Sequence, residues 1–355
     1  MKPIKLGMVG LGRAGKGMHL SELKGKDDMF QIYAVCDIIE ERRESIAKEY
    51  GAKAYATIEE LIADPEVEIV DIATRSCDHY KHACMALKAG KSVFLEKPIC
   101  CTYEDAKALM ELADSLKDKV TLYIRHNRRW EAKFEKAMEI CNSGIIGNVY
   151  EVKLTRNGFT TRNDWQTIDT YGGGQLLNWG PHIIDHALNF AGGDYTDIYA
   201  ETRQILASGN CEDHIKLLMT GINGRIIDME ISSGCATRMH EVVAYGDRGI
   251  LYDTGVENAQ LEWRYVKPGQ EIERLPASDA TPGTDPNFKK APPIEWLYGG
   301  AFVDVFGERL DETWINMYEN YREGKPYRIK HSEALKVVEV ISKVKEIMAE
   351  KNAKK

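Results

Sequence analysis

The chain lacks several features that mark whole classes of protein. No apolar run approaches the ~20 residues that a membrane-spanning helix needs, and no internal repeat is present. Acidic residues (55) outnumber lysine and arginine (47), and the net charge of −8 argues against a nucleic-acid surface. The eight cysteines form no C-x-x-C pair and are expected to be reduced, mostly buried thiols. We therefore expect a small-molecule partner, with no nucleic acid and no membrane.

Length and composition point to a globular enzyme with two domains. At 355 residues the chain exceeds the usual size of one hydrophobic core, and its 43% hydrophobic and 29% charged residues are typical of soluble globular proteins. The sequence enters its first apolar run directly after Met1-Lys2-Pro3, which leaves no room for a secretion signal. A cytoplasmic location is therefore expected.

A glycine-rich turn near the start of the sequence is typical of dinucleotide binding. It reads Gly10-Leu11-Gly12-Arg13-Ala14-Gly15 and follows the apolar run Ile4 to Val9. Gly10 permits the tight turn, Gly12 lets the backbone approach a pyrophosphate, and Gly15 allows the next helix to pack closely on the strand. The N-terminal N–H groups of that helix would face the phosphates.

An acidic residue after the second strand indicates which cofactor binds. The apolar run Gln31 to Cys36 leads into Asp37, 22 residues past Gly15. A carboxylate at this place accepts a hydrogen bond from the adenosine ribose and repels a 2′-phosphate, so we expect NAD rather than NADP. Arg42 and Arg43 keep NADP open, because either could reach a 2′-phosphate. The alternative without a cofactor is a glycine turn and a surface aspartate that caps the next helix.

Two patterns of strands divide the sequence. From residue 4 to about 125, short runs rich in valine and isoleucine alternate with helical stretches, as in a doubly wound parallel sheet. From about residue 149, alternating strands predict an α+β arrangement. The expected fold class is an α/β Rossmann domain, residues 1–125, followed by an α+β domain, residues 126–355.

The second half is expected to contain alternating strands, helices and one long surface excursion. The strands are Tyr150 to Thr155, Asp213 to Thr220, Arg225 to Ser232, Glu241 to Tyr245 and Ile250 to Thr254. The helices are Pro181 to Phe190, Phe306 to Glu323 and Ser332 to about Lys351. The excursion is the proline-rich, glycine-rich and charged segment from Lys267 to Pro293.

A lysine follows a predicted parallel strand at the edge where such sheets bind ligands. Glu96-Lys97-Pro98 comes directly after the strand Ser92 to Leu95. In a closed cleft, desolvation lowers the pKa of a lysine toward the range of a general base that removes a hydroxyl proton. Pro98 would fix the turn, with a cis bond as one option. The alternative is a solvated loop lysine paired with Glu96.

The densest polar cluster of the second half runs from Gly172 to His186. Its glycines allow close approach to a ligand, and Asn178 and His182, four residues apart, would project to one side of a helix that begins near Pro181. A neutral His182 could relay a proton. His182 and His186 also resemble a zinc-binding pair, but no third ligand has convincing spacing, so no metal is expected. The alternative is an ordinary core-facing helix.

These motifs, in this order, resemble the Gfo/Idh/MocA oxidoreductase family over nearly the whole sequence. The resemblance also rests on Ala73-Thr74 followed by His79, Asn127-Arg128-Arg129-Trp130, Ser143-Gly144-Ile145-Ile146-Gly147-Asn148-Val149 and Gly324-Lys325-Pro326. The stretch Asn127 to Trp130 is similar to the scyllo-inositol dehydrogenase-like branch. The resemblance implies a second domain with a large, open, mostly antiparallel sheet, assembly as a homo-dimer or homo-tetramer, and hydride transfer from a sugar or cyclitol carbon to NAD(P).

The resemblance implies roles for individual residues. Lys97 matches the lysine that assists removal of the hydroxyl proton, and His182 matches its partner histidine. Asn178 departs from the family, which commonly has aspartate there; an amide cannot accept that proton but could orient a substrate hydroxyl. Cofactor contacts are expected from Gly10, Leu11, Gly12, Arg13, Ala14, Gly15, Asp37, Ala73, Thr74, Arg75, His79, Glu96 and Lys97. Substrate contacts are expected from Arg125, Asn127, Arg156, Asn157, Trp165, Asn178 and His182.

The sequence therefore predicts an NAD-dependent dehydrogenase that oxidises a secondary hydroxyl of a sugar, glycoside or inositol. Lys97 is the predicted proton acceptor, with His182 and Asn178 beside it. Two alternatives stay open. One is an NAD-dependent oxidative glycosidase that acts through a transient 3-keto sugar, and the other is a non-catalytic NAD or sugar sensor, which Asn178 favours mildly.

Overall fold

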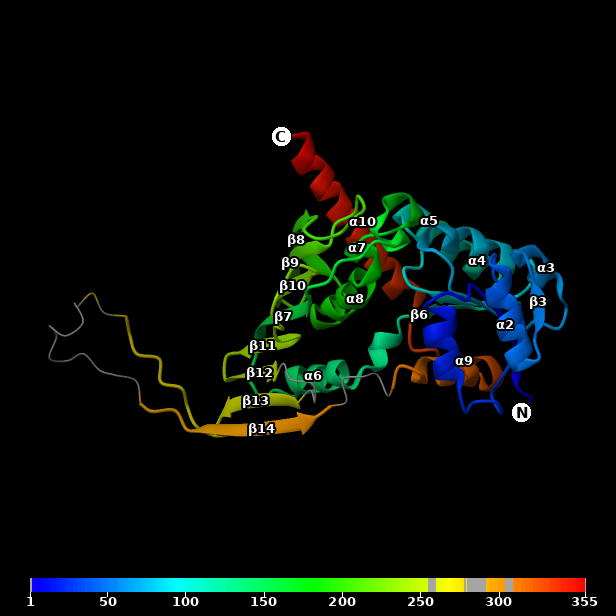
Figure 1. Cartoon of the computed structure of the whole chain (residues 1–355). Coiled ribbons are helices and arrows are strands. Elements are labelled where there is room, and N and C mark those ends of the chain that lie inside the picture. The colour runs from blue at the N-terminus through cyan, green and yellow to red at the C-terminus, as the bar shows by residue number, and fades with distance from the viewer. Residues whose placement is uncertain (1, 255–259, 278, 280–291, 304–308, 355) are drawn as a thin grey trace.

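Two sheets stand side by side and share helices between them (Figure 1). The computed structural model describes residues 2–254, 260–277, 279, 292–303 and 309–354. The N-terminal sheet and its helices run from blue to cyan in Figure 1, and the second sheet runs from green to orange. The predicted fold class, a Rossmann-type sheet followed by an α+β part, is confirmed.

The first sheet is parallel and covered on both faces. Its six strands lie in the order β3-β2-β1-β4-β5-β6. They are β1 (Ile4–Val9), β2 (Phe30–Cys36), β3 (Lys53–Tyr55), β4 (Ile69–Ile72), β5 (Ser92–Glu96) and β6 (Leu122–Arg125). The helices after β2 are α2 (Glu40–Tyr50), α3 (Ile58–Ala63), α4 (His79–Lys88) and α5 (Tyr103–Ser115). The strand order reverses between β1 and β4, so the carboxyl ends of the strands open a crevice there.

The helix expected after the glycine-rich turn is wound differently from the prediction. Its first part, η1 (Gly15–His19), is π-helical, with the N–H of His19 donating to the carbonyl of Ala14 at 2.9 Å. One α-helical turn, α1 (Leu20–Leu23), follows. His19 is thereby fully buried, and its Nδ1 lies 2.8 Å from a carboxylate oxygen of Asp71 on β4. The predicted helix after the turn is confirmed, but the local pattern carries no sign of this distant partner or of the π-helical winding.

The second sheet is open and mostly antiparallel. Its eight strands lie in the order β14-β13-β12-β11-β7-β10-β9-β8, with a parallel pair at β7 and β10. They are β7 (Val149–Asn157), β8 (Tyr195–Arg203), β9 (His214–Gly221), β10 (Ile226–Ser232), β11 (Val242–Gly246), β12 (Gly249–Asp253), β13 (Gln260–Val266) and β14 (Trp296–Phe302). The helices of the second half are α6 (Ala132–Ser143), α7 (Gln175–Asn178), α8 (Gly180–Phe190), α9 (Glu312–Glu323) and α10 (His331–Ala353). Over the described residues, none of the helices combines the length and apolar character needed to cross a membrane.

The predicted strands of the second half are confirmed with small shifts at their ends, but three further strands of the second half and one strand of the first sheet were missed. Strands β3, β8, β13 and β14 did not stand out, because β3 is short and β8 and β14 are half-exposed edge strands with little apolar alternation. The helix predicted from Phe306 begins only at Glu312, and residues 306–308 lie outside the described part of the chain.

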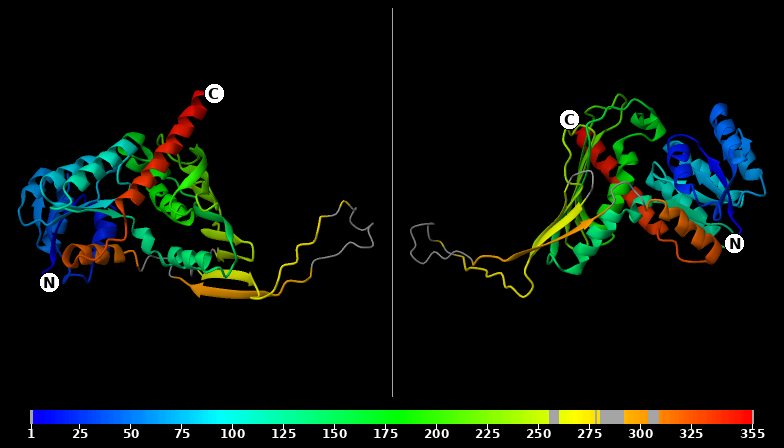
Figure 2. Two further views of the ribbon diagram at one scale, coloured as in Figure 1. Left: turned by 180° about the vertical axis from the view of Figure 1, so that it is seen from behind. Right: turned by 60° about the horizontal axis from the view of Figure 1, so that its bottom comes forward.

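The predicted surface excursion between Lys267 and Pro293 connects β13 to β14, and its two described ends lie side by side. The backbone N–H of Lys267 donates to the carbonyl of Glu295 at 2.9 Å, and the side-chain amide of Gln270 donates to the carbonyl of Pro293 at 3.1 Å. Figure 2 shows these paired ends running out beyond β13 and β14. Residues 278 and 280–291 of the excursion lie outside the described residues.

The C-terminal part of the chain returns to the first sheet. Trp314 of α9 is fully buried, with its ring centroid 4.4 Å from that of Phe94 and 5.8 Å from that of Phe30. Helix α9 therefore belongs to the core beneath the first sheet, although it follows the second sheet in sequence. The domain boundary at residues 125 and 126 stays a prediction.

Replacing Trp314 by alanine should lower the free energy of unfolding by about 3–5 kcal/mol, because the change empties a fully buried aromatic site. Urea unfolding followed by circular dichroism measures the loss. Trp296→Ala on the exposed edge strand β14 is the matched control and should change stability by less than about 1 kcal/mol. Equal losses in the two variants would contradict the packing role given to Trp314.

Candidate active site

A cleft of about 710 Å³ lies between the carboxyl ends of the first sheet and the start of α8. It is lined from both halves of the chain, which is the usual place for a ligand in an open α/β sheet. Fifteen residues predicted to touch cofactor or substrate line this cleft: Gly10, Gly12, Arg13, Ala14, Asp37, Ala73, Thr74, Arg75, His79, Glu96, Lys97, Asn127, Trp165, Asn178 and His182.

The glycine-rich turn needs glycine at two positions. Gly10 has φ +92°, and a Cβ there would lie 2.6 Å from the carbonyl oxygen of Ala73. A Cβ on Gly15 would overlap the carbonyl oxygen of Gly10. Gly12 is open, with only the Nη1 of Arg42 within reach at 3.8 Å. The backbone of the turn is thus free to approach a pyrophosphate, and a dinucleotide fits.

Asp37 is fixed by the backbone of this turn and of the next helix. Its Oδ2 accepts from the N–H of Leu11 at 2.7 Å, and its Oδ1 accepts from the N–H of Ile39 at 2.8 Å. Arg43 donates to the backbone carbonyl of Asp37 at 3.3 Å. Arg42 is half-exposed at the mouth of the cleft, 4.0 Å from the same carboxylate. Leu11 thus contributes through its N–H and not as a lining side chain.

Lys97 lies at the end of β5 and is partly buried in the cleft. Its Nζ donates to the backbone carbonyl of Asn178 at 3.1 Å, and the Lys97–Pro98 bond is cis. Burial lowers the pKa of Lys97, with a smaller opposing effect from Glu96 and further lowering by Arg125 and Arg128. A lysine in this setting releases its proton more readily than a solvated one and can accept one from an alcohol.

His182 lies beside Lys97 on the first turns of α8. Its side chain is buried, its Nδ1 has no hydrogen-bond partner, and burial together with Lys97 holds its pKa well below 6.5. The side-chain amide of Asn178 donates to Oε1 of Gln175 at 3.3 Å within α7, and the backbone carbonyl of Asn178 accepts from Lys97. His182 is therefore a neutral side chain in the cleft that Lys97 also lines.

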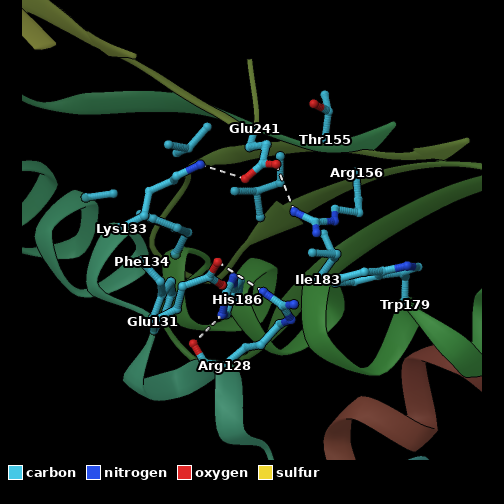
Figure 3. Close-up of a pocket in the computed structure, with 14 residues that line it drawn as sticks. Arg128, Glu131, Lys133, Phe134, Thr155, Arg156, Trp179, Ile183, His186 and Glu241 are labelled. Carbon is cyan, nitrogen blue, oxygen red and sulfur yellow. Dashed lines mark hydrogen bonds and ion pairs between the residues drawn. The ribbon is translucent and has the colours of Figure 1, made fainter. Parts of the chain in front are cut away.

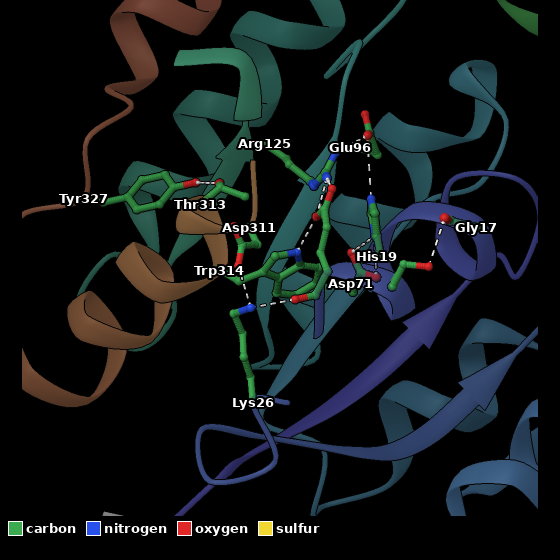
Figure 4. A network of polar contacts seen from close by, with 12 residues as sticks. Gly17, His19, Lys26, Asp71, Glu96, Arg125, Asp311, Thr313, Trp314 and Tyr327 are labelled. Carbon is green, nitrogen blue, oxygen red and sulfur yellow. Dashed lines mark hydrogen bonds and ion pairs between the residues drawn. The ribbon is translucent and has the colours of Figure 1, made fainter. Parts of the chain in front are cut away.

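A buried ionic network surrounds Glu96, the residue before Lys97 in the chain (Figure 4). Arg125 donates to Glu96 at 2.6 Å and to Glu22 at 2.6 Å, and the indole N–H of Trp314 donates to the same Glu22 at 2.8 Å. Burial alone would raise the pKa of Glu96, but Arg125 and Lys97 outweigh it and lower that pKa. Asp71 raises the pKa of His19 to about 9 against the effect of burial, so this histidine carries a charge as well.

Arg125 corrects one prediction. It was expected on the substrate wall, but its side chain is fully buried and both ends of its guanidinium are bound to Glu22 and Glu96. Its place on β6, inside the sheet, turns it toward these acids and away from the cleft. Arg125 supports Glu96 and does not line the cleft.

Two further predicted substrate contacts also lie outside the cleft. Asn157 donates to Glu230 at 3.0 Å on the second sheet, and Arg156 lines a smaller neighbouring cavity. Gly15 lies below the turn, where it packs and does not line the cleft. His186 faces away from His182, because its ring stacks on Phe134 at 3.9 Å. Among the described residues, no three metal-ligating side chains gather into a group.

Several cleft residues were missed by the sequence analysis. Arg128, Arg162, Asp164 and Trp179 all line the cleft. Arg128 and Trp179 stand within the motifs Asn127 to Trp130 and Gly172 to His186, but nothing in the spacing of these motifs marks either residue as a ligand contact. Arg162 and Asp164 pair with each other at 2.9 Å in a loop with no motif, so the sequence offered no signal for them.

The cleft also contains buried polar atoms that lack a partner. Within the described residues these include Oε2 of Glu96, Oδ1 of Asn127 and Nδ1 of His182. A buried polar atom without a hydrogen bond is costly, so these atoms favour a polar ligand in the cleft. The residues present fit a dinucleotide.

Family models match both halves of the chain. Residues 4–124 match the oxidoreductase family model with an NAD-binding Rossmann fold, and residues 134–252 match the GFO/IDH/MocA C-terminal domain. The chain belongs to the Gfo/Idh/MocA oxidoreductase family. The resemblance seen in the motifs is confirmed, and the protein is an oxidoreductase with a nicotinamide cofactor.

Characterised relatives act on inositol and sugar rings. The scyllo-inositol 2-dehydrogenase (NADP(+)) IolW of Bacillus subtilis is 31% identical over 192 residues, which cover 53% of this chain and 52% of the relative. The D-glucoside 3-dehydrogenase of Escherichia coli is 27% identical over 194 residues, 54% of each chain. The solved structure of the oxidoreductase yvaA from Bacillus subtilis has a TM-score of 0.81 at 20% identity, covering 99% of this chain and 97% of its own, and shows the same fold.

Gly15→Ala should weaken NADH binding at least about tenfold, because the added Cβ overlaps the carbonyl oxygen of Gly10 and distorts the phosphate-binding turn. A fluorescence titration with NADH measures the affinity. Gly17→Ala is the matched control, since nothing lies within 4 Å of a Cβ there and it belongs to the same π-helical segment. Unchanged NADH affinity in Gly15→Ala would contradict this account of the turn.

Proposed function

We propose that this protein is an NAD-dependent dehydrogenase that oxidises a secondary hydroxyl of a sugar, glycoside or inositol. The observation that carries the proposal is Lys97, a cleft amine with a lowered pKa that lies 3.1 Å from the carbonyl of Asn178. His182 lies in the same cleft with one ring nitrogen free. When bound, the nicotinamide cofactor accepts the hydride.

Lys97 and His182 divide the proton chemistry. Neutral Lys97 accepts the hydroxyl proton at Nζ, and the carbonyl of Asn178 holds this amine in position. His182 is neutral, so it hydrogen-bonds the same hydroxyl and orients its oxygen toward Lys97. The buried pair of Glu96 and Arg125 fixes the end of β5 and so the starting point of the Lys97 side chain.

The placement of Asp37 supports NAD as the cofactor. Its carboxylate faces the cleft and is held by two backbone N–H groups, so it is ready to accept from the adenosine ribose and would repel a 2′-phosphate. Arg42 at the mouth of the cleft is the group that would favour NADP. The assay below therefore compares the two cofactors directly.

The open face of the second sheet supports assembly as a homo-dimer or homo-tetramer. Tyr199 and Leu218 lie opposite each other on neighbouring strands and are 48% and 37% exposed, and Ile226 is 46% exposed. Apolar groups gathered on a sheet face are commonly covered by another chain.

The proposal is tested by scanning sugars, glycosides and inositols with NAD and with NADP while NADH absorbance and released aglycone are followed in parallel. Stoichiometric NADH from a ring alcohol, with NAD preferred, is the expected result. Aglycone release without net NADH would replace the dehydrogenase by an oxidative glycosidase. Binding of cofactor and sugar with no turnover of any kind would favour a sensor.

Lys97→Ala should lower kcat about 10²- to 10⁴-fold, the loss typical when a positioned general base is removed. NADH affinity should stay within about threefold, because the glycine-rich turn and Asp37 are untouched. Steady-state kinetics and the NADH titration give the two values. Lys81→Ala, a second lysine that lines the cleft, is the control and should retain turnover. Full activity in Lys97→Ala would refute the mechanism.

The rate should rise with pH and level off below pH 10.5, the ordinary value for lysine. Only the neutral amine of Lys97 accepts a proton, and burial lowers its pKa, so the rising limb of kcat/KM is shifted to lower pH. His182 adds no limb above pH 6.5, because its pKa is lower still. A pH profile of kcat/KM from pH 6 to 10.5 measures the limb. A flat or falling profile would rule out Lys97 as the base.

A further inference from the structure

A second, smaller cavity of about 40 Å³ lies beside the cleft (Figure 3). Trp179 and Arg128 line both spaces, so the indole stands between them. Arg156 of β7 lines the small cavity and not the cleft. In Figure 3, Arg156 approaches the indole from the sheet and Arg128 from the helical side. The small cavity thus holds a side chain that touches a cleft residue from behind.

The ring of His182 is oriented by packing. Its buried Nδ1 has no hydrogen-bond partner among the described residues. The side-chain amide of Asn178, one helical turn earlier, donates to Gln175 instead. The imidazole meets the indole of Trp179 edge-on, with the ring centroids 5.8 Å apart and the planes inclined at 62°. Because no hydrogen bond at Nδ1 holds the imidazole, the direction in which it faces depends on this aromatic contact.

Trp179 is held in turn by two guanidinium groups. The Cζ of Arg156 lies 4.0 Å from the ring centroid, and the Cζ of Arg128 lies 4.5 Å from it. Both lie within the ~6 Å at which the face of an indole attracts a cation. Arg156 donates to Glu241 at 2.8 Å, and Arg128 donates to Glu131 at 3.0 Å. Each guanidinium is therefore anchored by a carboxylate and fixes the indole between the two spaces.

We propose that Arg156 is a positioning residue of the reaction, which acts from outside the cleft by holding the indole of Trp179 against His182. The inference rests on the proposed function, in which His182 orients the substrate hydroxyl toward Lys97. Arg128 lines the cleft and can reach a ligand directly, but Arg156 does not line it. The effect of Arg156 on turnover therefore passes through the indole and the imidazole.

A double-mutant cycle of Arg156→Gln and His182→Ala tests this path. Arg156→Gln should lower kcat/KM about tenfold in the wild type but less than about twofold in His182→Ala, because a residue that acts through His182 loses its effect once the imidazole is gone. NADH affinity should stay within about threefold in every variant, since the glycine-rich turn is untouched. Tenfold losses in both backgrounds would overturn the proposal, because a general loss of structure does not depend on His182.

Arg238→Gln is the matched control for the change of charge. Arg238 lies 3.7 Å from the same carboxylate, that of Glu241, but does not line the small cavity. Its removal takes one cation from Glu241 and leaves the contacts of the indole in place, so kcat/KM should stay within about twofold of the wild type. Equal losses in Arg156→Gln and Arg238→Gln would assign the effect to charge and overturn the role given to the indole.

The orientation of His182 can also be measured without turnover. In protein with isotopically labelled histidine, NMR identifies the ring signals of His182 by their loss in His182→Ala. Arg156→Gln should shift or broaden these signals, and Arg238→Gln should leave them unchanged. Unchanged signals in Arg156→Gln would overturn the proposal and leave the dehydrogenase intact. Altered signals in a protein that oxidises no ring alcohol would defeat the proposed function and still support the hold of Arg156 on His182.

Discussion

The interaction on which the site depends is the balance of charge around Glu96. Glu22, Asp71 and Glu96 are bound to His19 and Arg125, and most of these groups are shielded from water. Lys97, next to Glu96 in the chain, adds a third positive charge only while it is protonated. A buried charge without a partner is strongly destabilising, so each member holds the others in place. The lysine is therefore positioned by the core of the first sheet and not by a flexible loop.

This balance also explains why the lysine can have a lowered pKa without losing its place. The carbonyl of Asn178 accepts from its amine whether or not the amine is charged. Glu96, its nearest acid, is already bound to Arg125 and so attracts the ammonium less strongly than a free carboxylate would. The position of the amine is therefore set by its hydrogen bond to the Asn178 carbonyl, and its pKa is set mainly by burial.

The parts of the site that depend on local sequence could be predicted, and the parts that depend on distant contacts could not. The spacing of Gly10, Gly15 and Asp37 follows from one turn and the next strand, so the cofactor side of the cleft could be derived residue by residue. The placement of Arg125 could not, since its acidic partner Glu22 lies 103 residues earlier. Likewise the role of Trp179 depends on two arginines from separate elements.

The fold follows the same division. The Val/Ile-rich runs of the first sheet and the alternating strands β9 to β12 were visible in the sequence, because burial on one or both faces dictates their pattern. The edge strands β8 and β14 were not, because their side chains are half in solvent and show little periodicity. The π-helical start at Gly15–His19 accompanies the buried contact of His19 with Asp71, which is distant in sequence.

The bond between Trp314 and Glu22 has a consequence for how the molecule is made. The ribosome synthesises the chain from the N-terminus, so the first sheet emerges long before Trp314, which completes its polar core. Until α9 is translated, Glu22 lacks that donor, and the rings of Phe30 and Phe94 lack the indole of Trp314 that packs on them. The core of the nucleotide-binding half therefore stays incomplete in a nascent chain until translation is nearly over.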